Sequence, residues 1–186
     1  MDVKEAIATR RAYRSFVPVT ITRELVEDLA GAAGLAPSCN NNQPCRFVFV
    51  YGAEALGNLH AALSEGNRWA KDSSLIIAAC TKKEDDCMMP GRDYFLFDAG
   101  VAVAFIVLRA TELGLVAHPI AGYDQDKAKG VLGIPADMTL ITLVNVGKHT
   151  TELKPYLSEN QIKAERGRPP RKALSEYLFI DHYTGR

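Results

Sequence analysis

Residues 95–108 read FLFDAGVAVAFIVL and form the longest apolar stretch of the sequence. This stretch is shorter than the roughly 20 residues that a bilayer requires, and it contains Asp98, so a transmembrane span is disfavoured. A helix that is apolar on nearly every side must be covered by other elements of a soluble protein. The sequence therefore predicts a long, buried central helix that is capped by Asp93 and ends near Gly114.

Apolar runs elsewhere indicate β-strands. RFVFVYG (46–52) is rich in β-branched and aromatic residues, and TLITLVNVG (139–147) is similar. The continuous apolar run SLIIAACT (74–81) is typical of a strand buried on both faces. Shorter strands are expected within VAHPIAGYD (116–124) and YLFID (177–181).

Helical patterns fill much of the remaining chain. Asp2 followed by Glu5 is a capping-box pattern that opens a short N-terminal helix, and Thr22 can cap a second helix that reaches about residue 33. Further helices are expected at 53–63 and 126–132. Because strands and helices are mixed without a βαβ rhythm, the predicted class is α+β.

The chain of 186 residues is long enough for one substantial core, and no internal repeat divides it. Beyond Lys148 the sequence turns polar and includes ERGRPPRK, an extended basic arm. The charged segment 82–92, KKEDDCMMPGR, is long enough to be a rim or a lid. We therefore expect one domain over residues 1–186, with a lid and a protruding tail.

Charge and cysteine content exclude several classes of protein. Lys plus Arg and Asp plus Glu both number 22, and this balance argues against a nucleic-acid partner. The N-terminal segment lacks the apolar region of a secretory signal, and Asp2 and Glu5 argue against a transit peptide. The four cysteines form no C-x-x-C pair, so free thiols in a reducing cytoplasm are expected.

Three arginines lie within RRAYRSF, residues 10–16. Cations at the end of a helix can compensate its dipole, which would explain Arg10 or Arg11. Arg14 lies beyond the first predicted helix, and guanidinium groups also bind phosphate through paired hydrogen bonds. Spacing alone favours the first explanation but leaves an anion site open.

A polar loop, APSCNNNQPC at residues 36–45, places five hydrogen-bonding side chains between two stiffening prolines. It can be a surface turn, a cradle for a ligand or a reactive-thiol site, the last of which needs a base that sequence alone cannot place. The spacing of Cys39 and Cys45, without a second pair or a nearby histidine, does not fit zinc. In the 118–124 segment, Gly122 allows a close approach of backbone to a ligand. His118 and Asp98 are interpreted as structural polar residues.

Taken in order, these stretches resemble the motifs of the FMN-dependent nitroreductase family. RRAYRSF matches R-R-S-x-R-x-F, and APSCNNNQPCRF matches A-P-S-x-x-N-x-Q-P-W-x-F. DAGVAVAFIVLRATELGL matches a D-x-G-x-A helix that ends in A-x-x-L-G-L. HPIAGYD, LGIP, a strand ending in Gly147 and the basic arm also agree. Each motif alone is weak, whereas the ordered set is specific and spans nearly the whole chain.

The resemblance implies a nitroreductase-like α+β fold with a central mixed or antiparallel sheet and FMN at the interface of a homodimer. The C-terminal arm of each subunit, about residues 148–186, would embrace the partner. From one subunit, the implied FMN contacts are Arg10, Arg11, Ala12, Arg14 and Arg171, with Arg168 as a weaker second arginine of the arm. From the other they are Pro37, Ser38, Cys39, Asn41 and Gln43. Ala121 and Gly122 would direct backbone N–H groups at the flavin edge.

The implied activity is reduction of nitroaromatics, quinones or similar acceptors by NADH or NADPH, in a ping-pong order of hydride transfers. No catalytic residue or metal ligand is implied, because the cofactor carries the reaction. Two alternatives stay open. The chain can be a specialised member that fragments flavin, dehalogenates or dehydrogenates, or a flavin-binding protein without turnover.

The sequence departs from the family motifs at two positions. Ala12 replaces the usual serine, and Cys45 replaces the usual tryptophan of Q-P-W. We expect bulk from elsewhere to fill the volume of the missing ring, because an empty volume of that size is costly. We also expect an open or partner-completed pocket at the lid, lined by Cys39, Cys87, Met88, Met89 and Tyr94.

Overall fold

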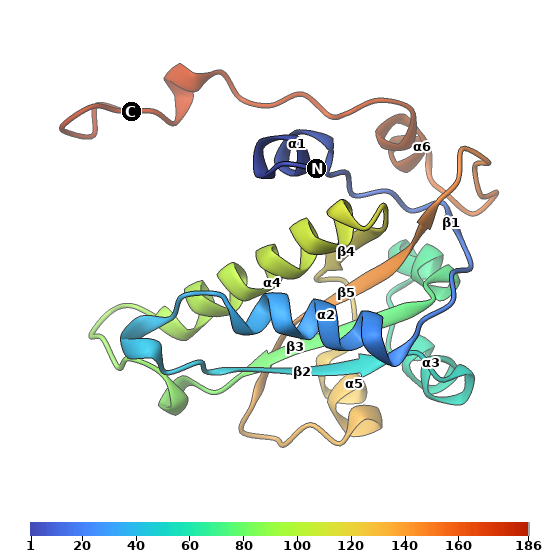
Figure 1. Cartoon of the computed structure of the whole chain (residues 1–186), viewed down its shortest axis with the longest axis horizontal. Coiled ribbons are helices and arrows are strands. Elements are labelled where there is room, and N and C mark those ends of the chain that lie inside the picture. Colours follow the sequence, from blue (N-terminus) through green and yellow to red (C-terminus); the bar gives the residue numbers. More distant parts are fainter. Residues whose placement is uncertain (186) are drawn as a thin grey trace.

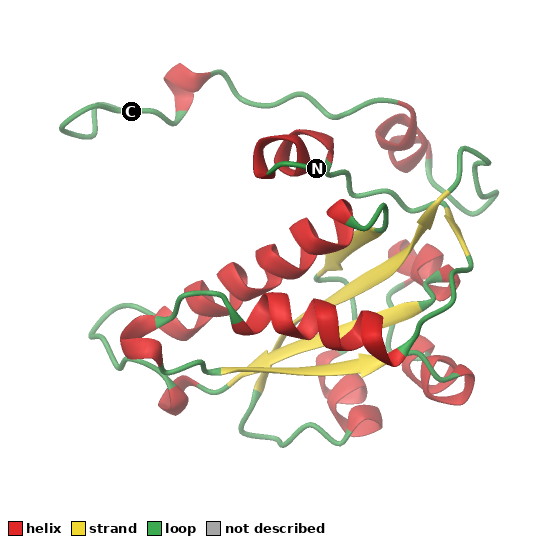
Figure 2. Ribbon diagram, in the orientation of Figure 1, coloured by secondary structure: helices red, strands yellow, loops and turns green. Residues whose placement is uncertain are grey.

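A five-stranded sheet forms the centre of the protein, with helices on both faces (Figures 1 and 2). The computed structural model describes residues 1–185. The strands are β1 (Phe16–Val17), β2 (Cys45–Val50), β3 (Leu75–Thr81), β4 (Val116–Ile120) and β5 (Thr139–His149). They are ordered β1-β5-β3-β2, and β4 also pairs with β5. Every pairing is antiparallel, and together with the helices this confirms the α+β class.

The alternating side chains of β3 build two cores, one on each face of the sheet. Ile76, Ala78 and Cys80 join one cluster of buried apolar residues, which also contains Trp69 and Phe16. Leu75, Ile77 and Ala79 join the other cluster, which contains Leu29 and Ile106. Since successive side chains of a strand point to opposite faces, a continuous apolar run is what a central strand requires. The prediction that this strand is buried on both faces is confirmed.

Helices α1 (Val3–Thr9), α2 (Arg23–Gly34), α3 (Ala53–His60), α5 (Gln125–Leu132) and α6 (Glu159–Arg166) surround the sheet. The predicted caps of the first two are present, because Asp2 accepts a hydrogen bond from the Glu5 N–H at 2.7 Å and Thr22 accepts one from the Leu25 N–H at 3.2 Å. Sequence reasoning missed α6, which carries its own capping box at Ser158 and Gln161.

Helix α4 (Tyr94–Glu112) is the predicted central helix and packs against α2, α1, β3 and β4. It is long and apolar enough to cross a membrane, but Ala102, Ile106 and Ala110 are buried inside the protein. It is therefore a core helix, as expected. Asp93 is the N-cap residue, as predicted, but its carboxylate makes no capping hydrogen bond and instead accepts one from Lys83 Nζ at 2.7 Å.

The C-terminal region has two parts. Residues up to the end of α6 pack on the same chain, where Leu157 is buried and Tyr156 and Ile162 lie against the core. From residue 167 the chain runs as an extended, mostly exposed segment across the top of Figure 1. The possible strand at 177–181 is not formed, and the segment contains only a short 3-10 turn, Leu174–Glu176.

Candidate functional site

The arginine run lies in the connection between α1 and β1, where all three arginine side chains are half-buried. A buried carboxylate, Glu165 of α6, holds this connection in place. It accepts hydrogen bonds from the Arg14 N–H at 2.6 Å and from the Ser15 N–H at 3.3 Å. Arg11 donates to the Ala164 carbonyl at 2.7 Å, which adds a second link to the same helix. Backbone contacts therefore position the run, leaving the side chains of Arg10 and Arg14 available.

Arg168 supplies the cation at the C-terminal end of α1. The sequence alone suggested Arg10 or Arg11 for this role. Its guanidinium donates to the carbonyl oxygens of Ala8 and Arg10, at the C-terminal end of α1. Carbonyls at a helix end lack partners within the helix and attract cations. Because Arg168 supplies that cation, Arg10 is not needed for it. The alternative explanation, an anion site, is thereby favoured.

The charges that act on the pKa of Arg10 all come from other arginines. Burial, followed by the charges of Arg168, Arg171 and Arg11, lowers the pKa of Arg10. The exposed Arg171 of the C-terminal segment thus lies close enough to act on Arg10, as the resemblance implied. Burial also lowers the pKa of Arg14, with Glu165 opposing the shift. A group of guanidiniums that repel one another is stabilised by a bound anion, and a phosphate dianion suits their paired donors.

An aromatic floor lies beneath Arg14. The Arg14 guanidinium carbon is 5.7 Å from the centre of the Trp69 ring, and the His118 ring lies 4.6 Å from the same ring. His118 Nδ1 is hydrogen-bonded to the Tyr13 carbonyl at 2.9 Å. Because His118 lies in β4 and Tyr13 lies in the arginine run, this bond fixes the run to the strand. The interpretation of His118 as a structural residue is confirmed.

Acidification should destabilise the protein through His118. Burial, with a smaller contribution from the charges of Arg14 and Arg10, lowers the pKa of His118 to about 4. Between pH 6.5 and 4 the unfolded chain binds a proton at His118 that the folded protein excludes. The free energy of unfolding should therefore fall by about 3 kcal/mol from pH 7 to pH 4 through this residue. Urea unfolding across this range should show the fall, and His118→Asn, which keeps a donor for Tyr13, should lack it. Equal slopes in both proteins would contradict the prediction.

The Ala121–Gly122 turn follows β4 and offers unpaired donors. Within residues 1–185, neither backbone N–H donates a hydrogen bond, whereas the Gly122 carbonyl accepts from Asn67 Nδ2 at 2.9 Å. A Cβ on Gly122 would lie 2.7 Å from Ser64 Oγ, so a side chain there would have to displace the Ser64 and Asn67 side chains. The turn is thus closely packed on one side, and the free N–H groups remain available for a ligand.

The Asn-rich loop (residues 36–44) is held in an unusual conformation. Asn40, Asn41 and Gln43 have positive φ angles of 48°, 57° and 49°. Such angles are uncommon for side chains other than glycine and persist only where the surroundings impose them. Ser38 Oγ accepts from the Gln43 N–H at 2.9 Å, so the Ser38 hydroxyl hydrogen is free. The Asn41 side chain makes no hydrogen bond within the described residues and is exposed.

Asp98 anchors this loop to α4. Its carboxylate is only 2% exposed and accepts a hydrogen bond from the Cys39 N–H at 2.8 Å. Burial raises the pKa of Asp98, and the nearby Asp86 carboxyl raises it further. Asp98 is therefore a structural buried polar group, as expected from the sequence.

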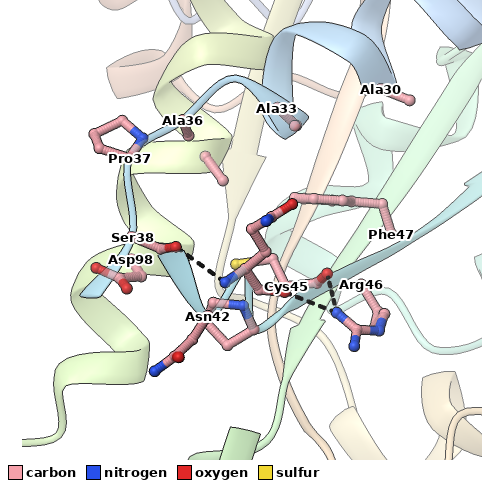
Figure 3. A pocket seen from close by; sticks show the side chains of 14 residues that line it. Ala30, Ala33, Ala36, Pro37, Ser38, Asn42, Cys45, Arg46, Phe47 and Asp98 are labelled. Atoms are coloured by element: carbon pink, nitrogen blue, oxygen red, sulfur yellow. Dashed lines mark hydrogen bonds between the residues drawn. The ribbon is translucent and has the colours of Figure 1, made fainter. Parts of the chain in front are cut away.

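A cavity of about 440 Å³ opens beside Cys45, where the family motif has tryptophan (Figure 3). Its walls include Ala30, Ala33, Ala36 and Ala102, which are too small to replace an indole ring. The expectation that other bulk fills this volume was wrong. The five residues expected to line the lid pocket do not line this cavity, and Met88 and Met89 are exposed. The lining consists instead of α2, the Asn-rich loop, the start of β2 and α4.

The Cys45 thiol should be unreactive at neutral pH. Burial, followed by the charges of Asp98 and Asp86, raises the pKa of Cys45 to about 11. Because the thiolate is the nucleophile, alkylation of Cys45 at pH 8 should be about 100-fold slower than that of an exposed thiol. Peptide mapping after iodoacetamide treatment of the native protein at pH 7–11 measures this rate. Rapid labelling at pH 8 would show that the thiol is not shielded.

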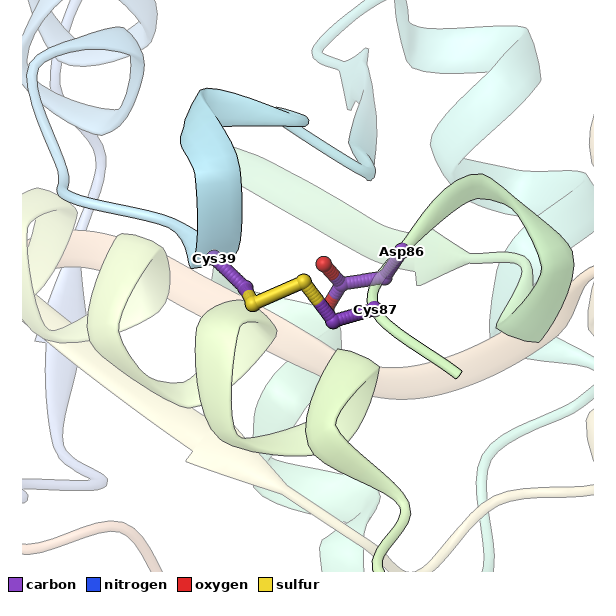
Figure 4. A group of neighbouring side chains, drawn as sticks. All are labelled: Cys39, Asp86 and Cys87. Atoms are coloured by element: carbon purple, nitrogen blue, oxygen red, sulfur yellow. A yellow bond between two sulfur atoms is a disulfide. The ribbon is translucent and has the colours of Figure 1, made fainter. Parts of the chain in front are cut away.

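The cysteines correct a further expectation, since they are not all free. Cys39 of the Asn-rich loop and Cys87 of the charged loop (residues 82–92) form a disulfide across 48 residues of sequence (Figure 4). Cys45 and Cys80 remain free thiols. Sequence spacing could not show this pairing, because it depends on two loops meeting in space.

Each chain carries two separate parts of the candidate site. Figure 1 shows the Asn-rich loop beside the start of α4, and the arginine run beside the end of the same helix. Within residues 1–185, no hydrogen bond or ion pair joins the two parts. The predicted residues are thus gathered into an arginine group, which includes Ala12 and Arg171, and the loop that carries Pro37, Ser38, Cys39, Asn41 and Gln43.

Comparisons with known proteins identify the family of this chain. A model of the nitroreductase family matches residues 7–89 and 61–148. A 15.4 kDa protein of Mycolicibacterium smegmatis is 31% identical over 72% of this chain and 84% of its own length. A protein of Archaeoglobus fulgidus named "Putative NADH dehydrogenase/NAD(P)H nitroreductase" is 27% identical over 86% of this chain and 92% of its own. A crystal structure described as an oxidoreductase containing FMN superposes with a TM-score of 0.84 at 28% identity, covering 100% of this chain and 95% of that one. The chain therefore belongs to the nitroreductase family of oxidoreductases.

Proposed function

We propose that the protein is an FMN-dependent oxidoreductase that uses NADH or NADPH to reduce nitroaromatics, quinones or similar electron-poor acceptors. The observation that carries this proposal is the group of arginines at the C-terminal end of α1, where Arg168 donates to the Arg10 carbonyl and Arg11 and Arg171 lie close enough to act on Arg10. A bound phosphate would neutralise this positive charge. The names of the relatives and the FMN in a structural neighbour support the same cofactor and donor.

The residues of this chain fit an FMN molecule. Arg10 and Arg171 would hold its phosphate, and Arg14, fixed above Trp69, would lie at the flavin ring. The free N–H groups of Ala121 and Gly122 would face the ring edge. Bound FMN would supply the two-electron chemistry, and no side chain of the site needs to act as an acid or base.

The Asn-rich loop of a second copy would complete this site. Its free Ser38 hydroxyl and Asn41 amide can bind a heterocycle but lie apart from the arginines of their own chain. A homodimer would bring them together. The C-terminal segment would cover the partner, because it exposes apolar side chains that one chain leaves uncovered: Leu174, Tyr177, Leu178, Ile180 and Tyr183. Donor and acceptor would then use one open face in turn, which is a ping-pong order.

An absorbance spectrum tests cofactor, donor and class together. We expect the purified protein to be yellow, to bleach on anaerobic addition of NADH or NADPH, and to regain colour when a quinone is added. The same preparation should sediment at twice the 20.3 kDa chain mass. A colourless protein that does not bind added FMN would refute the proposal. A yellow protein that neither donor reduces would refute the enzymatic part and leave only flavin binding.

A further inference from the structure

We propose that the Cys39–Cys87 bridge is a reversible thiol–disulfide switch that fastens the charged loop to the Asn-rich loop. The two loops meet beside the start of α4, and the Cα atoms of the two cysteines are 6.0 Å apart. In a reducing compartment, a disulfide is usually transient and senses redox state.

The bridge is the main link between these loops. The polar contacts across the gap run from Asn42 Nδ2 to Asp86 Oδ1 at 3.3 Å, and from the Asn40 and Asn42 amides to Cys87 Sγ at 3.5 and 3.6 Å. All three are long, and contacts to sulfur are weak. The other ties of the charged loop, Lys82–Asp137 and Lys83–Asp93, are surface ion pairs that contribute little. Cleaving the disulfide would therefore free the middle of the charged loop.

Neither Cys39 nor Cys87 belongs to the buried core, because both residues are half-buried. A dithiol, such as a thioredoxin-class protein or dithiothreitol, would attack Cys39 Sγ as a thiolate. Cys87 Sγ then leaves as the thiolate, with the Asn40 and Asn42 amides beside it. The second thiol of the reductant then resolves the mixed disulfide at Cys39. In total, two electrons and two protons pass to the cysteines, and the reductant becomes a disulfide.

The surroundings of the bridge also suit the reduced form. A carboxylate oxygen of Asp86 lies within 4.8 Å of both sulfurs. Asp86 is 6% exposed, and its Oδ2 atom is buried without a hydrogen-bond partner. Reduction would place two S–H donors beside this carboxylate. These donors would add to the hydrogen bond that the Asp86 carboxyl can share with Asp98, which favours a dithiol state that is well accommodated rather than disrupted.

The switch would act on the Asn-rich loop, which holds three residues with positive φ angles next to the bridge. Releasing Cys39 removes a restraint on that conformation. The loop would then bind flavin less tightly. This last step rests on the proposed function. The switch itself depends only on the two loops, so its primary test needs no cofactor.

Thiol counting and limited proteolysis of the wild-type chain form the primary test. Protein equilibrated with oxidised glutathione, then denatured and alkylated, should show two modified cysteines, Cys45 and Cys80. Native protein treated with dithiothreitol should show four, and re-oxidation should restore two. Trypsin should cleave at Lys83 and Arg92 about tenfold faster in the reduced protein, because the freed loop opens more often. FMN fluorescence, measured in parallel, should show weaker binding in the reduced protein.

Two variants give matched controls. Cys87→Ser should be cleaved at the fast rate with or without dithiothreitol, whereas Cys80→Ala, which keeps the bridge, should respond as the wild type does. Four alkylated cysteines after glutathione oxidation, or tightly bound zinc on four free thiols, would overturn the proposal. A bridge that dithiothreitol reduces only after unfolding, or equal cleavage in both states, would also overturn it. If the loop opens but FMN affinity is unchanged, the effect on flavin fails; if the protein binds no FMN at all, it is the proposed function that fails.

Discussion

Alanine at both Arg10 and Arg171 should leave the purified protein without bound flavin. The two guanidiniums act on each other across the connection between α1 and the C-terminal segment, where Arg10 is half-buried. A hydrogen bond from a charged group contributes about 1.5–3 kcal/mol, so each substitution should weaken FMN binding roughly 10- to 100-fold. Titration of the apoprotein, followed by quenching of FMN fluorescence, measures both single variants and the double variant.

Two further variants show whether FMN binding needs the paired N–H donors of the Arg10 guanidinium or only its positive charge. Arg10→Lys keeps the charge but loses the paired donors, and should bind FMN with intermediate affinity. Arg23→Ala removes one positive charge from the exposed surface of α2, where Arg23 pairs only with Glu27, and should bind as the wild type does. A double Arg10 and Arg171 variant that purifies yellow at full stoichiometry would disprove the assignment of the phosphate site.

Reduction of the Cys39–Cys87 bridge should lower the free energy of unfolding by about 4 kcal/mol. The estimate follows from the 48-residue separation of the two cysteines, because a cross-link removes conformations chiefly from the unfolded chain. Urea unfolding with and without dithiothreitol measures the difference. The double variant Cys39→Ala, Cys87→Ala should show no response to dithiothreitol. A wild-type protein whose unfolding midpoint does not move on reduction would contradict the prediction.

The main elements of the fold could be predicted because their signals are local. The run at β3 is apolar throughout, which a strand covered on both faces requires. The caps at Asp2 and Thr22 likewise depend on residues three positions apart. Prediction failed where a distant residue competes. Asp93 stands at the N-cap, but its side chain pairs with Lys83, and within residues 1–185 the apolar run at 177–181 pairs with no strand.

The candidate site was predictable in its chemistry but not in its assembly. Clustered arginines, free amides and a glycine turn indicated which residue types could bind a phosphate and a heterocycle. Only the structure shows that Arg168 neutralises the end of α1, which leaves Arg10 available. Glu165, which sequence reasoning missed, holds the arginine run through two backbone N–H groups. Its neighbours in the sequence are a polar, basic segment, so no local signal marks it.

By itself, the amino-acid sequence determined most of the secondary elements and the α+β class, because these follow from short-range periodicity. Tertiary structure alone decided the pairing of Cys39 with Cys87 and the open cavity at Cys45. Both depend on segments far apart in the chain. The disulfide needs two loops to meet at the start of α4. The cavity needs alanines from two helices and a loop to lie along one wall. Such long-range contacts leave no pattern within a window of sequence.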